Sequence, residues 1–483
     1  MITTIRADDG LTTQTADRPG RVFAGLTFGL AARDESPTTR GISRLLGQIV
    51  WQRLQPRRLS GRLLQDDLGL TFEVSGTSQE VAQHLAEIAT VIHGLENLTE
   101  AEVARAARIA ELSAEESVLL GSTAVPYWFG MAGPGLETLP PVEEFDVRLV
   151  AEWARRGLVA DNAVISATGP LPEGFSCRLP VREAGRVGVR RRPERPRVTP
   201  TTVVEASAPV SSLAILIPSA DHAYAIGRAV LEELHNRLVI ERPLVDRVEI
   251  IYSTATPEES FVSFSVVGPG DEAANVLALR SALEDVARGG VSQDALALAA
   301  SSLGAVRDAG SSALAQDLFS MAGSLVAGLP VQSIAAESRV AEDLDSDRVA
   351  AVVAAALERG FVLEYAGPDG DELAAALGAV VDPRQLLRPV APAALSRRER
   401  RAGWRFTGGK GSRDDLRVVL TGETLFTVSE RLVSGRVLSD LFVGFDAGDV
   451  LTIFDQEGSA LTFDADDWRD GPGLIEALRR SLS

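Results

Sequence analysis

The sequence predicts an α+β protein with two homologous halves, each an antiparallel sheet with helices, followed by a small β-barrel that ends in a helix. Three observations support this prediction. Strand–helix–helix units recur within the first 380 residues, a basic proline-bearing stretch separates the two copies, and the pattern changes to short β runs near residue 403. With 483 residues, the chain is long enough for three domains of ordinary size.

The repeat is clearest in the middle of each copy. Residues 72–76 form a predicted strand that ends at a glycine, and an amphipathic helix follows over 80–93. Residues 264–268 repeat this strand, and apolar residues at three- and four-residue steps again predict a helix after it. A second helix follows in both copies, with natural N-caps at Thr99 (in a capping box with Glu102) and Ser292.

The beginnings and ends of the two copies also agree. Each copy begins with a strand, a loop and a helix, over 23–51 and 213–236. Each copy ends with a helix, a strand and a Gly-Pro pair, over 146–170 and 345–368. Three matches in the same order indicate a duplicated unit rather than a chance similarity of amphipathic helices.

We therefore predict five segments along the chain. Residues 1–184 form the first half and 201–380 the second half. Residues 185–200, rich in arginine with two prolines, read as an exposed basic linker, and a second linker covers 381–402. The third domain is 403–483.

The third domain reads as strand after strand with tight turns, and then one amphipathic helix over 473–482. This arrangement resembles a pleckstrin-homology-type barrel capped by its helix. We do not expect lipid binding, because Arg469, Arg479 and Arg480 are few and aspartates lie beside them. A protein-docking module or a structural appendage is the expectation.

Composition limits the partners and the compartment. A net charge of −19 argues against nucleic acid as a partner. No apolar run is long enough to span a bilayer, so no membrane association is expected. A single cysteine, Cys177, and the absence of a signal-like start favour the cytosol. The four scattered histidines offer little material for a zinc site.

One early helix carries the functional signal. Residues 41–50 open a helix after a strand and a polar loop, and this layout resembles the zinc helix of the pitrilysin/insulinase peptidases, whose motif is His-x-x-Glu-His. Arg44 stands at the first ligand position, Gly47 at the general-base position and Gln48 at the second ligand position. A guanidinium cannot ligate zinc, and glycine has no carboxylate to activate water.

The resemblance covers about residues 1–380 and implies a two-lobed clamp that encloses peptides. Many members are heterodimers in which one subunit has lost its metal site, and this sequence is similar to such a degenerate, alpha-type subunit. We therefore expect no metal in this chain and zinc in the partner. The family's third ligand is a glutamate on a later helix, to which neither Glu111 nor Glu115 can be aligned.

The family's second half usually supplies an arginine and a tyrosine, seven residues apart, that hold the substrate backbone. Tyr252 fits the tyrosine position, but Val245 stands seven residues before it. Arg242 or Arg247 could serve if the loop has changed length. The alternative is a tyrosine whose hydroxyl is hydrogen-bonded at the edge of a sheet.

These observations lead to three hypotheses. The first is a non-catalytic subunit of a heterodimeric zinc peptidase, which has no activity alone and binds peptide substrate for a partner with an intact His-x-x-Glu-His helix. Family analogy suggests a role in bacterial peptide maturation or leader removal. The second is a non-enzymatic scaffold subunit, and the third is a stand-alone peptide-binding protein.

Overall fold

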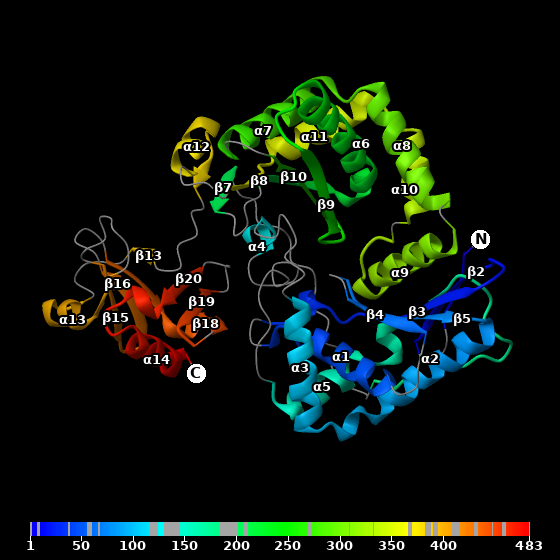
Figure 1. The fold of residues 1–483 in the computed structure, drawn as a ribbon, viewed down its shortest axis with the longest axis horizontal. Helices are drawn as coiled ribbons and strands as arrows, with labels where there is room; N and C mark the ends of the chain where they lie inside the picture. The colour runs from blue at the N-terminus through cyan, green and yellow to red at the C-terminus, as the bar shows by residue number, and fades with distance from the viewer. Residues whose placement is uncertain are drawn as a thin grey trace.

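The computed structural model describes residues 2–6, 10–36, 39–55, 60–65, 68–114, 124–129, 145–182, 201–205, 211–268, 272–308, 310–331, 333–365, 370–381, 388–389, 395–407, 416–428, 433–446, 448–455 and 460–482. They form two six-stranded sheets with helices packed on them, and a smaller third part beside them (Figure 1). The basic linker predicted at 185–200 lies outside the described residues.

The first sheet has the strand order β1-β2-β6-β3-β5-β4. Its strands are β1 (Ile2–Arg6), β2 (Thr12–Ala16), β3 (Val22–Phe28), β4 (Gly61–Gln65), β5 (Leu70–Gly76) and β6 (Ala163–Ala167). The helices of this part are α1 (Ile42–Leu54), α2 (Ser78–His93), α3 (Glu100–Ala114), α4 (Ala124–Phe129) and α5 (Val147–Gly157). Alternate residues such as Leu26 and Phe72 bury one face of the sheet in a core with Leu45 of α1 and Leu85 of α2.

The second sheet has the order β12-β7-β11-β8-β10-β9. Its strands are β7 (Thr202–Glu205), β8 (Ser211–Pro218), β9 (Arg247–Thr254), β10 (Glu259–Val267), β11 (Val362–Tyr365) and β12 (Val380–Val381). Its helices are α6 (Ala223–His235), the π-helical η8 (Asn236–Glu241), α7 (Glu272–Gly289), α8 (Gln293–Asp308), α9 (Ser311–Ala327), α10 (Ile334–Glu342), α11 (Ser346–Glu358) and α12 (Gly370–Leu377).

Five strands follow the same path in both sheets, which agrees with the predicted repeat. In both, the central strand pairs antiparallel with its two neighbours, and β9 matches β4 at the edge. The expectation of purely antiparallel sheets was wrong, because β2 runs parallel to β6 and β7 runs parallel to β11. The last long strand of each half lies between two strands that come early in that half: β6 lies between β2 and β3, and β11 between β7 and β8. This position makes one of its two pairings parallel.

One helix from each half packs on the sheet of the other half. We call these two helices, α4 and α9, the exchanged helices. Helix α9 packs on β3 and β6 of the first sheet, where Ala322 and Val326 contact Val164. Helix α4 packs on the second sheet, where the ring of Trp128 meets Phe261 edge-on at 5.9 Å. The N–H of Ala124 donates to the buried carboxylate of Glu364 at 2.6 Å. The two halves are therefore joined through the inner faces of their sheets.

The third part consists of two sheets and a terminal helix. A five-stranded sheet has the order β13-β17-β16-β15-β14, and a three-stranded sheet has the order β18-β19-β20. The elements are β13 (Arg388–Pro389), α13 (Arg397–Ala402), β14 (Trp404–Arg405), β15 (Arg417–Thr421), β16 (Thr424–Val428), β17 (Val433–Val437), β18 (Leu441–Asp446), β19 (Val450–Asp455), β20 (Ala460–Asp464) and α14 (Gly471–Leu482). The predicted terminal helix is present, but the described residues do not form a closed barrel.

Local signals in the sequence located several helix starts. Thr99 and Glu102 form the predicted capping box, and the hydroxyl of Ser292 accepts from the Ala295 N–H at 3.2 Å. Helix α2 begins two residues earlier than predicted, because Thr77 and Glu80 form a capping box of their own. No helix among the described residues combines the length and the apolar character that crossing a bilayer requires.

Candidate functional site

The start of α1 is fixed by a buried carboxylate. Gly41 precedes the helix with φ at +89°, a left-handed conformation that glycine adopts without strain. The carboxylate of Glu35 accepts from the N–H groups of Gly41 at 2.6 Å and Ser43 at 2.8 Å. A negative group at this end also complements the helix dipole. The loop before α1 therefore ends in a side-chain cap.

Glu35 lies among charged groups at the N-terminal end of α1. Burial raises the pKa of Glu35 to about 7, although hydrogen bonds from Ser43 and Gly41 act in the opposite direction. Burial also lowers the pKa of Arg40 to about 10 and holds the pKa of Arg44 below its ordinary value, while Glu35 counteracts both shifts. Both guanidinium groups remain charged at neutral pH. The end of the helix therefore carries two cations and a carboxyl group poised to titrate near neutrality.

The general-base position of the motif is closed by leucines. A Cβ atom on Gly47 would lie 2.6 Å from Leu70 Cδ1 and 3.2 Å from Leu63 Cδ2. Leu70 is fully buried in the core of the first half. A glutamate at position 47 would have to displace packed side chains of β4 and β5. A carboxylate at this position therefore requires Leu63 and Leu70 to move from their places in the structure.

The residues at the three motif positions do not fit a zinc ion. Arg44 presents a cation, Gly47 has no side chain, and Gln48 offers only an amide. The nearby carboxylate of Glu35 is engaged by backbone N–H groups. In the part of the chain that the structure describes, no group of three His, Cys, Asp or Glu side chains is arranged to hold a metal. The side chain of Glu111 and all of Glu115 lie outside it.

The structure does not bring Arg247 and Tyr252 together. They lie five positions apart on β9, so their side chains point to opposite faces of the strand. Arg247 is exposed and pairs with Glu249 at 3.0 Å. Tyr252 packs toward the helices, with its ring 5.1 Å from that of Tyr224 and its hydroxyl 3.1 Å from Thr254 Oγ1. Arg242 is exposed just after η8. Their use in substrate binding stays a prediction.

The inner faces of both sheets carry buried polar side chains, some of them against the exchanged helices α4 and α9. On the first sheet, the hydroxyls of Thr27 and Thr71 lie 2.9 Å apart, and Arg62 pairs with Glu73 at 2.8 Å. On the second sheet, Ser212 donates to Glu364 at 2.8 Å. Strands β4 and β9 lie at the ends of their sheets and pair with one neighbour each among the described strands. These edges can accept an extended peptide by strand addition.

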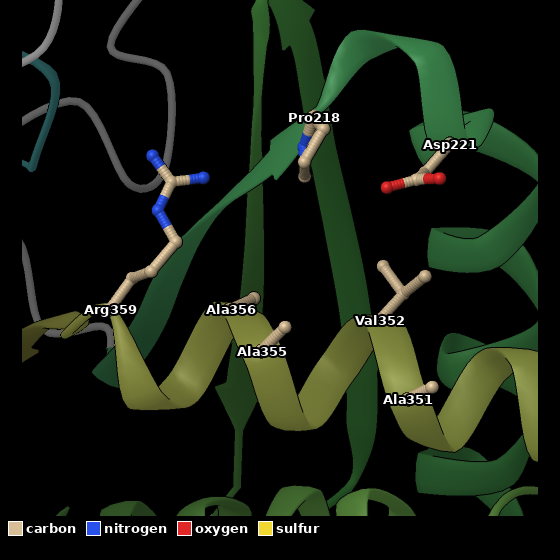
Figure 2. Close-up of a pocket in the computed structure, with 7 residues that line it drawn as sticks. All are labelled: Pro218, Asp221, Ala351, Val352, Ala355, Ala356 and Arg359. Atoms are coloured by element: carbon tan, nitrogen blue, oxygen red, sulfur yellow. The ribbon is translucent and has the colours of Figure 1, made fainter.

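Two cavities lie in the second half. One of about 210 Å³ has a floor of alanines from α11, with Asp221 at one end and Arg359 at the other, as Figure 2 shows. Arg359 also forms two hydrogen bonds with Glu259, at 2.7 and 3.0 Å. The other, of about 690 Å³, lies between η8 and α8 beside Ile240 and Leu298. Apart from Asp221 and Arg359, the first cavity is lined by proline, alanine and valine, and its volume is small for a peptide of several residues.

Comparison with known proteins identifies the fold. No protein-family model and no curated protein matches the sequence. Among solved structures, a protease from Helicobacter pylori is similar at 13% identity with a TM-score of 0.58, over 76% of this chain and 100% of that one. A chain of complex III2 from Candida albicans, with Inz-5 bound, gives 15% identity and a TM-score of 0.60, over 77% and 99%. The inactive domain of a peptidase M16 from Pseudomonas fluorescens gives 13% and 0.57, over 75% and 98%.

These likenesses show that the chain has the fold of the M16, pitrilysin-type peptidases. The matches cover about three quarters of the chain, and one of them is a domain described as inactive. At this level of identity the fold alone is established. The resemblance inferred from the α1 motif and the repeat is thus confirmed for the fold.

Sequence reasoning missed two features of the site. Glu35 was overlooked because a charged residue in a polar loop is normally solvated. Its position, six residues before a glycine that opens a helix, was the available signal. The exchanged helices α4 and α9 were also missed, because amphipathicity does not tell which sheet a helix covers.

Proposed function

We propose that this chain is a non-catalytic subunit of a heterodimeric zinc metallopeptidase, which shapes the chamber and binds peptide for a catalytic partner. The observation that carries this proposal is α1, where Arg44, Gly47 and Gln48 replace the zinc and base positions and leucines close the space at Gly47. The zinc and the base would come from a homologous partner with an intact His-x-x-Glu-His helix. Removal of leader segments in bacterial peptide maturation is the role we favour.

The edges of the two sheets support peptide binding. Strands β4 and β9 offer backbone donors and acceptors to an extended chain. If the loop before β9 rearranges on binding, Arg242 or Arg247 could act with Tyr252 on a peptide carbonyl. We place the assembly in the cytosol. We propose that the third domain, 403–483, is a docking module with a pleckstrin-homology-like arrangement.

The scaffold alternative has one supporting observation. A similar structure is a chain of complex III2, a large assembly. On this alternative, the chain would form a stable complex and show neither peptide affinity nor any effect on cleavage. A stand-alone peptide-binding protein would instead bind peptide without a partner.

A reconstitution experiment separates these functions. The chain would be purified alone, a complete zinc-helix homologue alone, and the two together, and cleavage of a peptide library would be followed by mass spectrometry. We expect cleavage by the pair that clearly exceeds cleavage by the homologue alone, and none by this chain. Equal cleavage with and without this chain would overturn the proposal, as would cleavage by this chain alone.

A further inference from the structure

The third part of this acidic protein has a basic face. The chain carries a net charge of −19, yet residues 395–417 hold eight basic and three acidic residues. We define the arginine patch by four described residues, Arg398 and Arg401 on α13, Arg405 on β14 and Arg417 on β15. In Figure 1, α13 lies at the outer end of the third part, away from the two large sheets.

The fold holds these arginines together. Arg398 and Arg401 are three residues apart and share a face of α13. Arg405 and Arg417 stand directly opposite each other on antiparallel strands, so both side chains leave the same face of the sheet. The guanidinium of Arg417 donates to the carbonyl of Arg401 at 3.1 Å. The helix and the two strands therefore form one continuous cationic surface.

The helix of the patch is held against the sheet although α13 has six residues. Leu395, just before the helix, is buried with Val419 and Phe426 of the sheet. The capping box of Ser396 and Glu399 fixes the first turn, with hydrogen bonds of 3.2 and 2.7 Å. A pre-ordered surface loses little side-chain and backbone freedom when a ligand binds.

The one described acidic residue within α13, Glu399, offsets part of the charge of the patch, and its four arginines leave it positive. The carboxylate of Glu399 accepts from the Ser396 N–H and from the hydroxyl of Thr421 at 3.2 Å. The hydrogen bonds with Ser396 lower the pKa of Glu399, so it stays ionised and caps the start of the helix. Arg398 and Arg401 are exposed at the surface.

The residues around the arginine patch favour a small partner over a membrane or a nucleic acid. The turn that carries Asp466 and Asp467 lies beside β14, where Thr407 N donates to the Asp467 carbonyl at 2.7 Å. A membrane or a nucleic acid is a wide anionic surface and would meet these aspartates together with the arginines. In the described residues of the third part, Val437 is the one large apolar side chain classed as exposed, which gives little apolar surface for membrane insertion.

We infer that the arginine patch binds a short acidic segment of a polypeptide partner. Six helical residues span about 9 Å, and an extended peptide covers that length in about three residues. Guanidinium groups bind carboxylates through paired hydrogen bonds, so a short run of Asp or Glu fits the patch. With a screening length of about 8 Å at physiological salt, the acidic remainder of the chain does not cancel this attraction. The inference goes beyond the proposed peptidase role and does not depend on it.

Fluorescence anisotropy on the full chain tests this inference. The probes are a short labelled Glu-rich peptide, the same peptide with every Glu replaced by Gln, phosphatidylserine vesicles and single-stranded DNA. We expect saturable binding of the Glu peptide alone, and R398E/R401E should weaken it by about tenfold or more. The matched variant R339E/R348E reverses two exposed helical arginines elsewhere and should leave the affinity unchanged within about twofold. Circular dichroism would check that both variants fold.

Three results would overturn the inference. They are no binding of the Glu peptide, equal loss of binding in both variants, and binding of DNA or vesicles as tight as that of the peptide. The last result would show a general polyanion surface rather than a site for acidic polypeptide. None of these measurements uses a catalytic partner, so the outcome is independent of the peptidase proposal.

Discussion

The two halves share one topology but fix their corresponding helices by different means. In the first half, Glu35 comes from the loop immediately before α1 and caps it through Gly41 and Ser43. In the second half, Glu337 comes from α10, far along the chain, and accepts from Ala225 N at 2.9 Å. Its other oxygen lies 3.0 Å from the ring of His222, which has φ at +56° where the first half uses Gly41. Each half therefore has a buried glutamate at the start of this helix, and the two glutamates come from different parts of the chain.

The packing of these helices is more alike than their caps. A Cβ on Gly227 of α6 would lie 2.8 Å from Ile250 and 3.4 Å from Val262, on β9 and β10. Gly47 of α1 meets Leu63 and Leu70 on the matching strands β4 and β5. At the position where a zinc peptidase needs its base, this chain has a glycine that lets α1 approach its sheet. Gly227, one position nearer the start of its helix, does the same for α6.

The largest expected effect tests this equivalence of the glycines. Gly47→Glu and Gly227→Glu should each destabilise the protein by about 5 kcal/mol, because they overpack a closed contact and bury an unpaired charge. Chemical denaturation would measure this. Gly289→Glu, on a helical glycine with open space around it, should stay within about 0.5 kcal/mol. If Gly47→Glu behaved like Gly289→Glu, the space at the base position would be open after all.

The same reasoning applies to restoring the motif. The triple variant Arg44→His, Gly47→Glu, Gln48→His should be less stable than the natural chain and should not cleave peptides. Peptide hydrolysis with stoichiometric zinc in this variant would show that the site had lost only its ligands and not its shape.

The exchanged helices offer the next comparison. Trp128→Ala should destabilise the protein by about 4 kcal/mol, because Trp128 is almost fully buried against Phe261. Phe319→Ala on α9, which faces Gly25 of β3, should cost about 3 kcal/mol. Trp128→Phe keeps a ring in place and should cost less than either. Thermal unfolding would rank the three variants by their loss of stability. If only one of the two alanine variants were destabilised, the halves would be joined through one helix rather than two.

The cap of α1 should make stability depend on pH. Glu35 has a pKa of about 7 in the folded protein against an ordinary value of 4.5, so the folded state holds this proton more tightly. The protonated Glu35 contributes fully to the free energy of unfolding when the pH is below the ordinary pKa of 4.5. This contribution, about 3 kcal/mol, is lost as the pH rises through about 7. Glu35→Gln should remove this dependence of the unfolding free energy on pH. Glu96→Gln, which changes an exposed residue, should leave it in place. Parallel stability curves for Glu35→Gln and the natural chain would contradict the assignment.

The smallest effect compares the caps of α3 and α8. Thr99→Ala should cost about 1 kcal/mol, a usual value for an N-cap. Ser292→Ala should cost slightly more, because the Ser292 hydroxyl also donates to Glu233 at 2.7 Å and its loss leaves a buried acceptor with fewer donors. Equal values from urea denaturation would indicate that the Glu233 contact adds nothing.

The sequence predicted what depends on local patterns. Periodicity located strands such as β6, and capping residues located the starts of α3 and α8. The motif at Arg44, Gly47 and Gln48 led to the prediction that this helix holds no zinc, and that statement stays a prediction.

What the sequence could not predict depends on contacts between distant residues. The burial of Glu35, the replacement of its role by Glu337, and the crossing of α4 and α9 to the opposite sheets all need tertiary packing. The parallel pairing of β2 with β6 also follows from the path of the whole chain rather than from either strand.

Zinc titration of the isolated chain, followed by calorimetry and by metal analysis after gel filtration, tests the central claim most directly. We expect no stoichiometric zinc to remain with the protein and no change in its unfolding temperature. One tightly held zinc per chain, lost on substitution of Gln48 or of a carboxylate beside α1, would show that the first half keeps a metal site and would contradict the account.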